Sequence, residues 1–339
     1  IHDRPKKAFL DRLQKVFGFD PPREHGYNTV EAIQAMLDGK AKLFFAMGGN
    51  FLQATPDTQR TAKALQRCEM LVHVSTKLNR GHLLNNEWSI ILPCLARSEI
   101  DSQAYGEQFV TVENSMGVVH TSRGHLKPAH EGLYSEPAIV AWLAERVLGP
   151  ETPVSWCWLI ENYDRIRDLI AEAIPHFENF NERVREPGGF HLYNGARKRE
   201  FHTDDGKAQF SINPAPELSL PSGAFRMMTI RTHDQYNTTV YGNDDRYRGI
   251  KGGRRVAFMN EHDLREAGIA AGSQVDLIND FGGKHRVAAR FTVVPYPIPR
   301  RCIGTYFPET NVLVPLENYA EGSFTPASKD VVVRVSPSD

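Results

Sequence analysis

The sequence predicts an α/β region followed by a β-barrel within one chain of 339 residues. Two observations favour this combination. Between residues 42 and 92, short apolar runs alternate with a helical pattern at the spacing of a parallel, doubly wound sheet. From residue 188 onward, strand signals dominate and a single short helical stretch interrupts them, which favours a closed or nearly closed barrel.

Composition places the chain among ordinary globular proteins. Hydrophobic residues make up 41% and charged residues 24% of it, and no apolar run approaches the roughly 18 residues of a membrane-spanning helix. The 40 basic and 41 acidic side chains nearly cancel, so we expect neither nucleic acid nor a membrane as a partner. The four cysteines form no CxxC pair and the opening residues lack a secretory signal, so we expect buried free thiols and a cytoplasmic location.

The α/β region begins with a capped helix. Asn28 stands three residues before Glu31, which is the spacing of a capping box, and Gly39 ends a helix predicted over 29–38. Strands are predicted at 42–47, 70–75 and 88–92, because each run is short, apolar and followed by polar or proline-bearing turns. All three strands are expected to be buried.

A second helix is predicted between the first two strands. Thr55, Pro56 and Asp57 supply the cap, the first-turn proline and the first-turn acid of a helix that reaches about Arg67.

A hairpin and a set of helices precede the barrel. The β-rich runs within 109–121 flank a turn at Gly117 and predict a hairpin inserted beside the sheet. A capped helix is predicted over 135–148, and helices over 158–174 and 177–185 are separated by Pro175. The predicted segments are a lead-in (1–28), the α/β region (29–150) with its hairpin at about 105–125, a helical connector (151–187) and the barrel (188–339).

The barrel region is predicted from a series of short strands. A turn at Asp205 and Gly206 joins two strands within 201–211, and a short helix is predicted over 261–267. The other predicted strands lie at 225–231, 255–260, 273–280, 285–294, 302–307 and 331–335.

Polar groups follow the first two strands at one edge of the predicted sheet. Gly48 and Gly49 let backbone N–H groups approach an anionic ligand, and Asn50 can bond a sugar or base; a tight turn is the alternative. The second strand ends in a similar set, namely Ser75, Thr76, Lys77 and Asn79. A nucleotide-like ligand is therefore predicted at this edge.

The loop after the strand at 225–231 is dense in hydrogen-bonding side chains. Arginine matches a phosphate bidentately, so this loop suits a polar, phosphorylated heterocycle. Its polar residues are Arg231, His233, Gln235, Asn237 and Thr238. A basic stretch follows, for which a solvated turn is favoured over a diphosphate site: Arg246, Arg248, Lys251, Arg254 and Arg255.

Local catalytic motifs are absent from the sequence. It contains no GxSxG, HExxH, GxxxxGK[ST] or GxGxxG string. His120, His125 and His130 recur every five residues, a spacing that places them on neither one helix face nor one strand face, so no metal site is expected there.

Several strings, in this order and spacing, resemble the molybdopterin oxidoreductases of the formate dehydrogenase type. They are FFAMGGN, SIILP, VTVENSMGVVHTSRGHLKP, MTIRTHDQYNTTVYG, RVAFMNEHDLREAGIAAGSQVDLIN, NVLVP and PASKD. The closest resemblance is to the branch labelled oxidoreductase alpha (molybdopterin) subunit. It covers nearly the whole chain but only the carboxyl-terminal half of such an enzyme.

The resemblance implies a Rossmann-like domain and a double-psi β-barrel, the molybdopterin dinucleotide-binding domain. The implied cofactor is molybdenum held by two molybdopterin guanine dinucleotides (bis-MGD). Residues expected to contact it are Gly48, Gly49, Asn50, Ser75, Thr76, Arg231, Thr232, His233, Gln235, Tyr236, Asn237, Thr238, Asn311 and Lys329. Ile230 and Asn237 depart from residues common in the family at these positions.

The resemblance also implies an activity, a two-electron redox reaction of a small-molecule substrate, of which formate is one example. It places the iron–sulfur [4Fe-4S] cluster and the protein ligand to molybdenum in an amino-terminal half. The expected partners are that half and an electron-transfer protein, and the isolated chain is expected to be inactive. Two alternatives stay open: a non-catalytic nucleotide or molybdopterin binding module, and an unrelated nucleotide- or sugar-binding enzyme.

Overall fold

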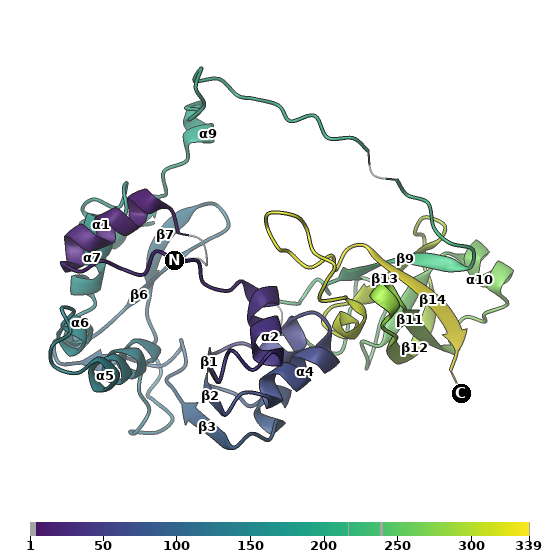
Figure 1. Cartoon of the computed structure of the whole chain (residues 1–339), viewed down its shortest axis with the longest axis horizontal. Helices are drawn as coiled ribbons and strands as arrows, with labels where there is room; N and C mark the ends of the chain where they lie inside the picture. Colours follow the sequence, from purple (N-terminus) through teal and green to yellow (C-terminus); the bar gives the residue numbers. More distant parts are fainter. Residues whose placement is uncertain (1–4, 216, 238–239, 339) are drawn as a thin grey trace. The chain divides into compact units, whose positions relative to one another are not determined.

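The computed structural model describes residues 5–215, 217–237 and 240–338, and these form two compact units (Figure 1). Unit 1 contains the described residues up to Gly26 and those from Pro93 to 215. Unit 2 contains Tyr27–Leu92 and the described residues from 217 onward. Contacts therefore group residues 27–92 with the barrel, whereas the sequence grouped 29–150 together. The predicted domain boundaries stay predictions.

Unit 2 contains a small sheet with helices on one side. Its strands are β1 (Leu43–Met47), β2 (Met70–Ser75) and β3 (Trp88–Pro93), in the order β1-β2-β3, and β1 and β2 run parallel. Its helices are α2 (Thr29–Leu37), α3 (Phe51–Ala54), α4 (Thr58–Gln66) and the 3₁₀ turn η1 (Arg80–Leu83). The Rossmann-like assignment stays a prediction for this sheet.

The predicted capping box is confirmed at α2. Glu31 N donates to Asn28 Oδ1 and Asn28 N donates to Glu31 Oε2, both at 3.0 Å. The buried face of this helix packs against α4 and β2 through Ile33, Leu65 and Leu71.

Two predictions for the sheet are wrong. Strands β1 and β3 are not buried: no residue of β1 is fully buried, and nearly all residues of β3 are exposed. Thr55 does not cap α4: its hydroxyl donates to Phe51 O at 2.8 Å, which ends α3 instead. The N-cap of α4 is Asp57, whose carboxylate is turned away from the helix and toward the barrel.

The second part of unit 2 is a closed barrel in the strand order β10-β12-β11-β14-β9-β13, which confirms the prediction of a closed barrel. Two of its pairs, β10 with β12 and β9 with β13, are parallel, and the others are antiparallel. Its strands are β9 (Ala224–Ile230), β10 (Val256–Met259), β11 (Gln274–Asn279), β12 (Arg286–Pro295), β13 (Cys302–Tyr306) and β14 (Val331–Pro337). Helix α10 (Glu261–Ala267) and two 3₁₀ turns, η2 (Phe281–Gly283) and η3 (Asn311–Leu313), complete it.

Alternating side chains of these strands fill the barrel, as expected for a closed sheet. Met227, Leu277, Phe291 and Ile303 are among its fully buried members. Helix α10 begins at Asn260, whose side chain accepts a hydrogen bond from His262 N, and it ends at Gly268 in the left-handed conformation.

Sheet and barrel are joined by a buried ion pair. Arg286 of β12 donates to Asp57 Oδ2 through Nη2 at 2.7 Å and through Nε at 3.1 Å. Both side chains are nearly inaccessible, at 5% and 4% exposure. Asn311 adds a second link, because its Nδ2 donates to Gln53 O at 2.8 Å and its carbonyl accepts from Asp57 N at 2.9 Å.

Unit 1 is built from helices around a small sheet. Its strands are β4 (Ser102–Gln103), β5 (Gly106–Glu107), β6 (Val110–Glu113), β7 (Val118–Ser122) and β8 (Phe190–His191), and its helices are α1 (Lys7–Phe17), α5 (Glu136–Leu148), α6 (Trp156–Glu161), α7 (Asp164–Ala173), α8 (Phe180–Arg185) and α9 (Gly195–Lys198). The hairpin β6-β7 is confirmed, but β7 pairs with β8, not with the sheet of unit 2. Ser135 caps α5 as predicted.

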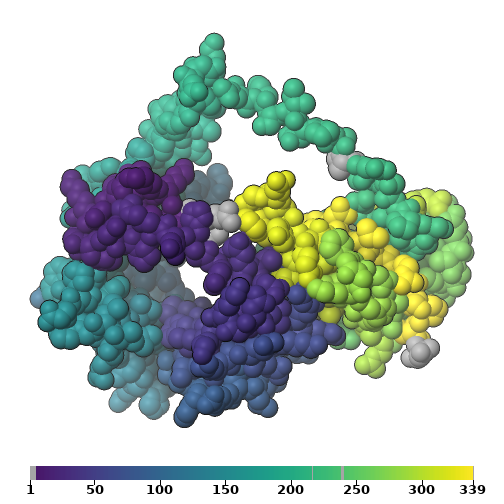
Figure 2. Space-filling view, viewed as in Figure 1, coloured from purple at the N-terminus to yellow at the C-terminus, as the bar shows by residue number. Residues whose placement is uncertain are grey.

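Two other expectations for unit 1 are wrong. The helix predicted over 158–174 is two helices, α6 and α7, because the backbone at Asn162 is extended. The strands predicted within 201–211 do not form, although the predicted turn does, because Gly206 N donates to Thr203 O at 3.0 Å. This part is mostly exposed, and Figure 2 shows it as a narrow teal-green segment. Its apolar residues find no partner surface among the described residues: Phe210 is 95% and Ile212 98% exposed.

The described cysteines form no disulfide. Cys68 and Cys94 are buried as predicted, whereas Cys157 and Cys302 are only partly buried. No helix in the described part of the chain combines the length and apolarity needed to cross a membrane.

Candidate functional site

The loop after β1 carries the first predicted site residues. Gly48 N donates to Val74 O at 2.8 Å, so the loop continues the parallel pairing before it turns away. Gly48 and Gly49 both have positive φ angles, of 65° and 69°, which favour glycine. A tight turn without any ligand would require the same two φ angles. A Cβ on Gly49 would meet nothing within 4 Å, so the space beside it is open to a ligand.

Asn50 follows these glycines with one atom unsatisfied. Its Nδ2 donates to Gln53 Oε1 at 2.7 Å, but its Oδ1 is buried and has no hydrogen-bond partner. A buried acceptor without a donor is costly, so Asn50 Oδ1 is suited to accept a hydrogen bond from a ligand.

The loop after β2 lies against the loop after β1. Asn79 Nδ2 donates to Gly49 O at 3.0 Å, which joins the two loops as the sequence predicted for strand ends at one sheet edge. Thr76 and Lys77 are exposed, while Ser75 is buried and its hydroxyl contacts His82 Nε2 at 3.2 Å.

Two histidines that the sequence did not predict lie at this edge. His73 and His82 lie ring to ring, with centroids 4.5 Å apart, and His73 Nε2 is buried without a partner. Burial lowers the pKa of His73, and the nearby His82 lowers it further, so a neutral ring is favoured there. The residues around His82, RGHL at 80–83, gave no sign of this contact in the sequence.

The loop after β9 separates into a buried and an exposed part. Thr232 and Gln235 are buried, and Gln235 holds the loop: its Oε1 accepts from Arg254 Nη2 at 2.9 Å and its Nε2 donates to Phe307 O at 3.0 Å. These two predicted contact residues therefore have structural partners within the barrel.

The other residues of this loop face solvent. His233 packs on the Tyr247 ring with centroids 4.2 Å apart, and Tyr236 is 75% exposed. Asn237 is exposed with a φ of 56°. Thr238 lies outside the described residues.

Arg231 and Lys329 bring two cations to this end of the barrel. Arg231 is exposed, and its guanidinium donates to no described residue. Lys329 Nζ donates to Thr229 O and lies 3.4 Å from Thr229 Oγ1. Burial lowers the pKa of Lys329, and electrostatic repulsion from Arg231 lowers it further.

Asn311, also predicted to contact a ligand, has a different position. It is 2% exposed and, as described above, links the barrel to α3 and α4. The structure thus places Asn311 in the joint of unit 2.

A cationic cavity of about 500 Å³ lies at this joint, between α3, α4 and η1 on one side and the barrel on the other. Three arginines and one acid contribute to its wall, together with tyrosine, amide and hydroxyl groups. Its polar lining residues are Gln53, Thr58, Gln59, Arg80, Tyr241, Asn243, Arg254, Arg255 and Glu309. A polar, anionic ligand suits such a wall.

Arg254 shows that the basic stretch is more than a solvated turn. Its side chain is buried, with Nε bonded to Glu309 Oε1 at 2.8 Å and the guanidinium stacked on the Tyr241 ring at 3.9 Å. Arg248 is likewise bound, to the buried Asp245 at 2.6 Å. The preference for a solvated turn is therefore wrong for these two arginines, because each is paired with an acidic side chain of the barrel region.

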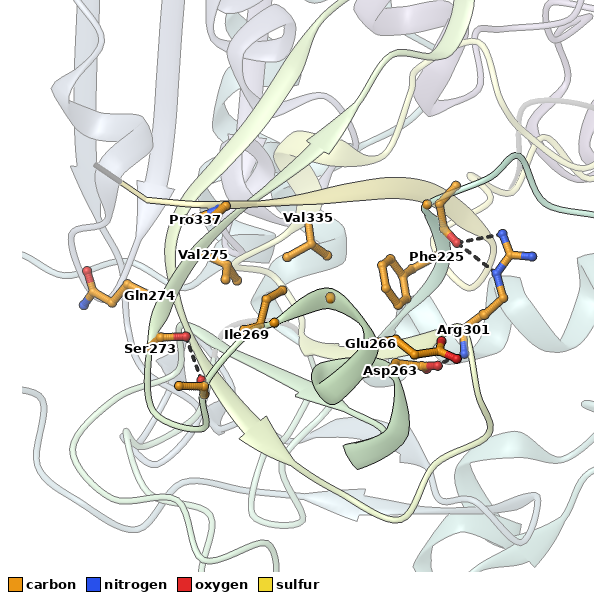
Figure 3. A pocket seen from close by; sticks show the side chains of 15 residues that line it. Phe225, Asp263, Glu266, Ile269, Ser273, Gln274, Val275, Arg301, Val335 and Pro337 are labelled. Atoms are coloured by element: carbon orange, nitrogen blue, oxygen red, sulfur yellow. Dashed lines mark hydrogen bonds between the residues drawn. The ribbon is translucent and has the colours of Figure 1, made fainter.

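A different cavity, of about 630 Å³, lies at the opposite end of β9 (Figure 3). Phe225, Ile269, Val275 and Val335 point into it, and Arg301 at its rim is already bonded to backbone carbonyls. It contains none of the predicted site residues.

The three regularly spaced histidines do not converge. His120 Nδ1 contacts Thr121 O at 3.1 Å and His130 Nδ1 accepts from Gly132 N at 2.9 Å, both local contacts. Among the described residues, no group of three or more potential ligand side chains is arranged to hold a metal ion.

Comparison with known proteins gives one family model, the "Molydopterin dinucleotide binding domain", which matches residues 225–332. An uncharacterized oxidoreductase of Mycobacterium tuberculosis is 46% identical over 344 residues, which cover 100% of this chain and 44% of that protein. A nitrate reductase of Shewanella frigidimarina is 26% identical over 274 residues, 69% of this chain and 26% of its own length.

One solved structure extends the comparison to the fold. Acetylene hydratase from Pelobacter acetylenicus superposes with a TM-score of 0.61 at 14% identity, over 97% of this chain and 50% of that one. The chain thus spans about half the length, or less, of the proteins that it matches.

Proposed function

We propose that this chain is the carboxyl-terminal, cofactor-binding part of a bis-MGD molybdenum enzyme of the formate dehydrogenase type. The premise is that the chain carries a molybdopterin dinucleotide-binding domain and is a molybdopterin oxidoreductase module. The observation that carries this proposal is that the matched residues 225–332 form the closed barrel from β9 into β14. The remainder of the enzyme, with its [4Fe-4S] cluster and its ligand to molybdenum, lies in the additional length that the relatives have.

Three features of unit 2 fit such a cofactor. A dinucleotide carries a diphosphate, and the Arg231 guanidinium and the Lys329 ammonium are two cations whose mutual repulsion lowers the pKa of Lys329. A nucleoside carries hydrogen-bond donors, and Asn50 Oδ1 is a buried acceptor without one. The cavity at the joint adds Arg80, Arg254 and Arg255 to the positive charge of the same unit.

In this proposal the cofactor supplies a molybdenum centre that exchanges two electrons with the substrate. The residues of this chain hold it. Arg231 and Lys329 bind phosphate oxygens, Gly49 presents its backbone N–H group, and Asn50 accepts from the sugar or base. The N–H group of Gly48 is already bonded to Val74 O, so Gly48 shapes the turn instead. Gln235 and Asn311 act as positioning residues, because their side chains fix the β9 loop and the sheet-to-barrel joint.

The setting of the enzyme belongs to the same proposal. We place it in the cytoplasm, with a small-molecule substrate and an electron-transfer partner. The choice of formate as substrate rests on the resemblance of the sequence alone.

Replacing Arg231 tests the proposal. In the full-length protein, Arg231→Met should lower the retained cofactor at least tenfold, because a charge-assisted hydrogen bond to a phosphate contributes about 1.5–3 kcal/mol. The measurement is molybdenum content together with guanine nucleotide released on denaturation.

The matched control is Arg226→Met on the same strand. Arg226 pairs with Asp330 at 2.6 Å on the barrel surface, at the far end of β9 from Arg231. Cofactor content should stay at the wild-type level in this variant. Equal retention by both variants would contradict the assignment of Arg231.

A further inference from the structure

Helix α5 of unit 1 is apolar on two opposite faces. Helix α6 lies beside α5 (Figure 1). On one face of α5, Ala138 and Ala141 are buried and pack with Ile160 of α6 and with Tyr163, which lies just before α7. On the other, three side chains form a stripe with spacings of three and four residues. They are Val140, Leu143 and Val147, which are 40%, 46% and 72% exposed.

The two faces lie on opposite sides of the helix. At 100° per residue, Val140, Leu143 and Val147 fall within about 60° of each other and point away from Ala138 and Ala141. An apolar face of a helix is normally covered, and spacings of three and four residues are those of a helix–helix seam. None of the three belongs to a hydrophobic core cluster of the described residues.

We infer that this stripe is the docking surface for another helix of the same full-length polypeptide, one outside residues 1–339. The inference rests on the proposed function, which places this chain within a longer enzyme. In a relative that is 46% identical, the whole of this chain aligns with 44% of the relative's length. The remaining length of such a protein is ample to supply the helix.

A second copy of the chain suits the stripe less well. A stable dimer buries about 800 Å² on each partner, the surface of some 20 residues, whereas the stripe offers three side chains. A helix that belongs to the same polypeptide avoids most of the entropy lost on association, so a narrow seam suffices for it.

The stripe also indicates the chemistry of its partner. Glu136 lies one turn before Val140 on the same face and forms no salt bridge with any described residue. The partner helix should therefore present apolar side chains at spacings of three and four, followed by a lysine or arginine opposite Glu136.

Cysteine labelling tests this surface. In a background with Cys157→Ser and Cys302→Ser, which removes the two partly buried thiols, Leu143→Cys is treated with a maleimide in the 339-residue chain and in the full-length protein. The control is Met116→Cys, in the exposed turn between β6 and β7, where the native side chain is 75% exposed. Val147→Cys serves as a second probe of the stripe if Leu143→Cys does not fold.

The proposal expects Leu143→Cys to react at least tenfold more slowly in the full-length protein than in the 339-residue chain, and Met116→Cys to react equally in both. Fast labelling of the stripe in both would overturn it. Slow labelling of the isolated 339-residue chain would also overturn it, because the chain itself or a second copy would then cover the stripe. Repeating the labelling at lower protein concentration separates these two cases.

Cofactor content measured in the same preparations keeps the two proposals apart. A labelled stripe in a protein that holds molybdenum and guanine nucleotide overturns only the docking surface. A protected stripe in a protein without cofactor overturns only the proposed function.

Discussion

Replacing Asp57 by asparagine should destabilise unit 2 strongly, because it removes one charge from the ion pair that joins sheet and barrel. The Asp57 and Arg286 side chains are 4% and 5% exposed, and two hydrogen bonds, of 2.7 and 3.1 Å, connect them. Asparagine has nearly the same volume and tolerates the positive φ of 49° at this position, so the change acts mainly through charge.

The size of the effect follows from what remains around Arg286. Removing one partner of a buried ion pair costs about 3–5 kcal/mol. Glu317 Oε2 lies 3.5 Å from Arg286 Nη2 and partly compensates. We therefore expect the free energy of unfolding of unit 2 to fall by about 3 kcal/mol, the lower end of that range.

Urea unfolding followed by circular dichroism measures this loss. The control is Asp330→Asn, which breaks the surface pair with Arg226 and should cost about 1 kcal/mol or less. The double variant Asp57→Asn, Arg286→Met should recover much of the stability, because no unpaired charge is left. If Asp57→Asn costs no more than Asp330→Asn, the buried pair does not hold sheet and barrel together.

Three further predictions concern other parts of the chain. Gly124→Ala should lower the stability of unit 1 by about 1–3 kcal/mol in thermal unfolding, because its Cβ would lie 1.9 Å from Glu99 O, whereas Gly26→Ala, with nothing within 4 Å, should change little; equal midpoints would contradict this. Burial alone would raise the pKa of Glu317, but hydrogen bonds from Lys284, the backbone and Arg60 lower it to about 2. The ionised Glu317 carboxylate therefore stabilises the fold fully above pH 4.5, and this stabilisation is lost as the pH falls toward 2. Glu317→Gln should remove that part of the pH dependence in acid unfolding, and an unchanged profile would refute the assignment. At Gly49, where φ is 69°, substitution by alanine should lower the free energy of unfolding by about 1–2 kcal/mol, and substitution by asparagine by less. Both variants should nevertheless lose guanine nucleotide if the backbone approaches the cofactor. Retention by the asparagine variant would show that the loop is only a turn.

Local patterns predicted most elements of unit 2. The capping box at Asn28 and Glu31, the strand β2 and the helix α10 all appear at the predicted residues. These signals are local, because alternation, capping and turn residues act over a few positions of the chain. The same holds for the barrel strands, whose alternating apolar residues mark the inner surface.

Predictions failed where distant residues decide the structure. Asp57 was assigned to the first turn of α4, but its carboxylate binds Arg286, which is 229 positions away. Arg254 was assigned to solvent because its acidic partner, Glu309, lies 55 positions away. The turn at Asp205 and Gly206 suggested two flanking strands within 201–211, yet no strand pairs there among the described residues, and β structure requires a partner.

The sequence predicted that two loops meet at one sheet edge, but not the contacts of their side chains; the ligand of the candidate site stays a prediction. Strand ends at one sheet edge were brought together by the bond from Asn79 to Gly49. The contact between His73 and His82 was not foreseen, because it depends on how η1 folds back over β2. Asn311 and Gln235, expected to face a ligand, are occupied by backbone partners within unit 2.

The most direct test of the central claim is the composition of the full-length protein as purified. Its molybdenum content should be about one atom per chain, with about two guanine nucleotides released on denaturation. A folded protein that contains neither molybdenum nor guanine nucleotide, after expression in cells that make the cofactor, would contradict the claim that this chain is the cofactor-binding part of a molybdenum enzyme.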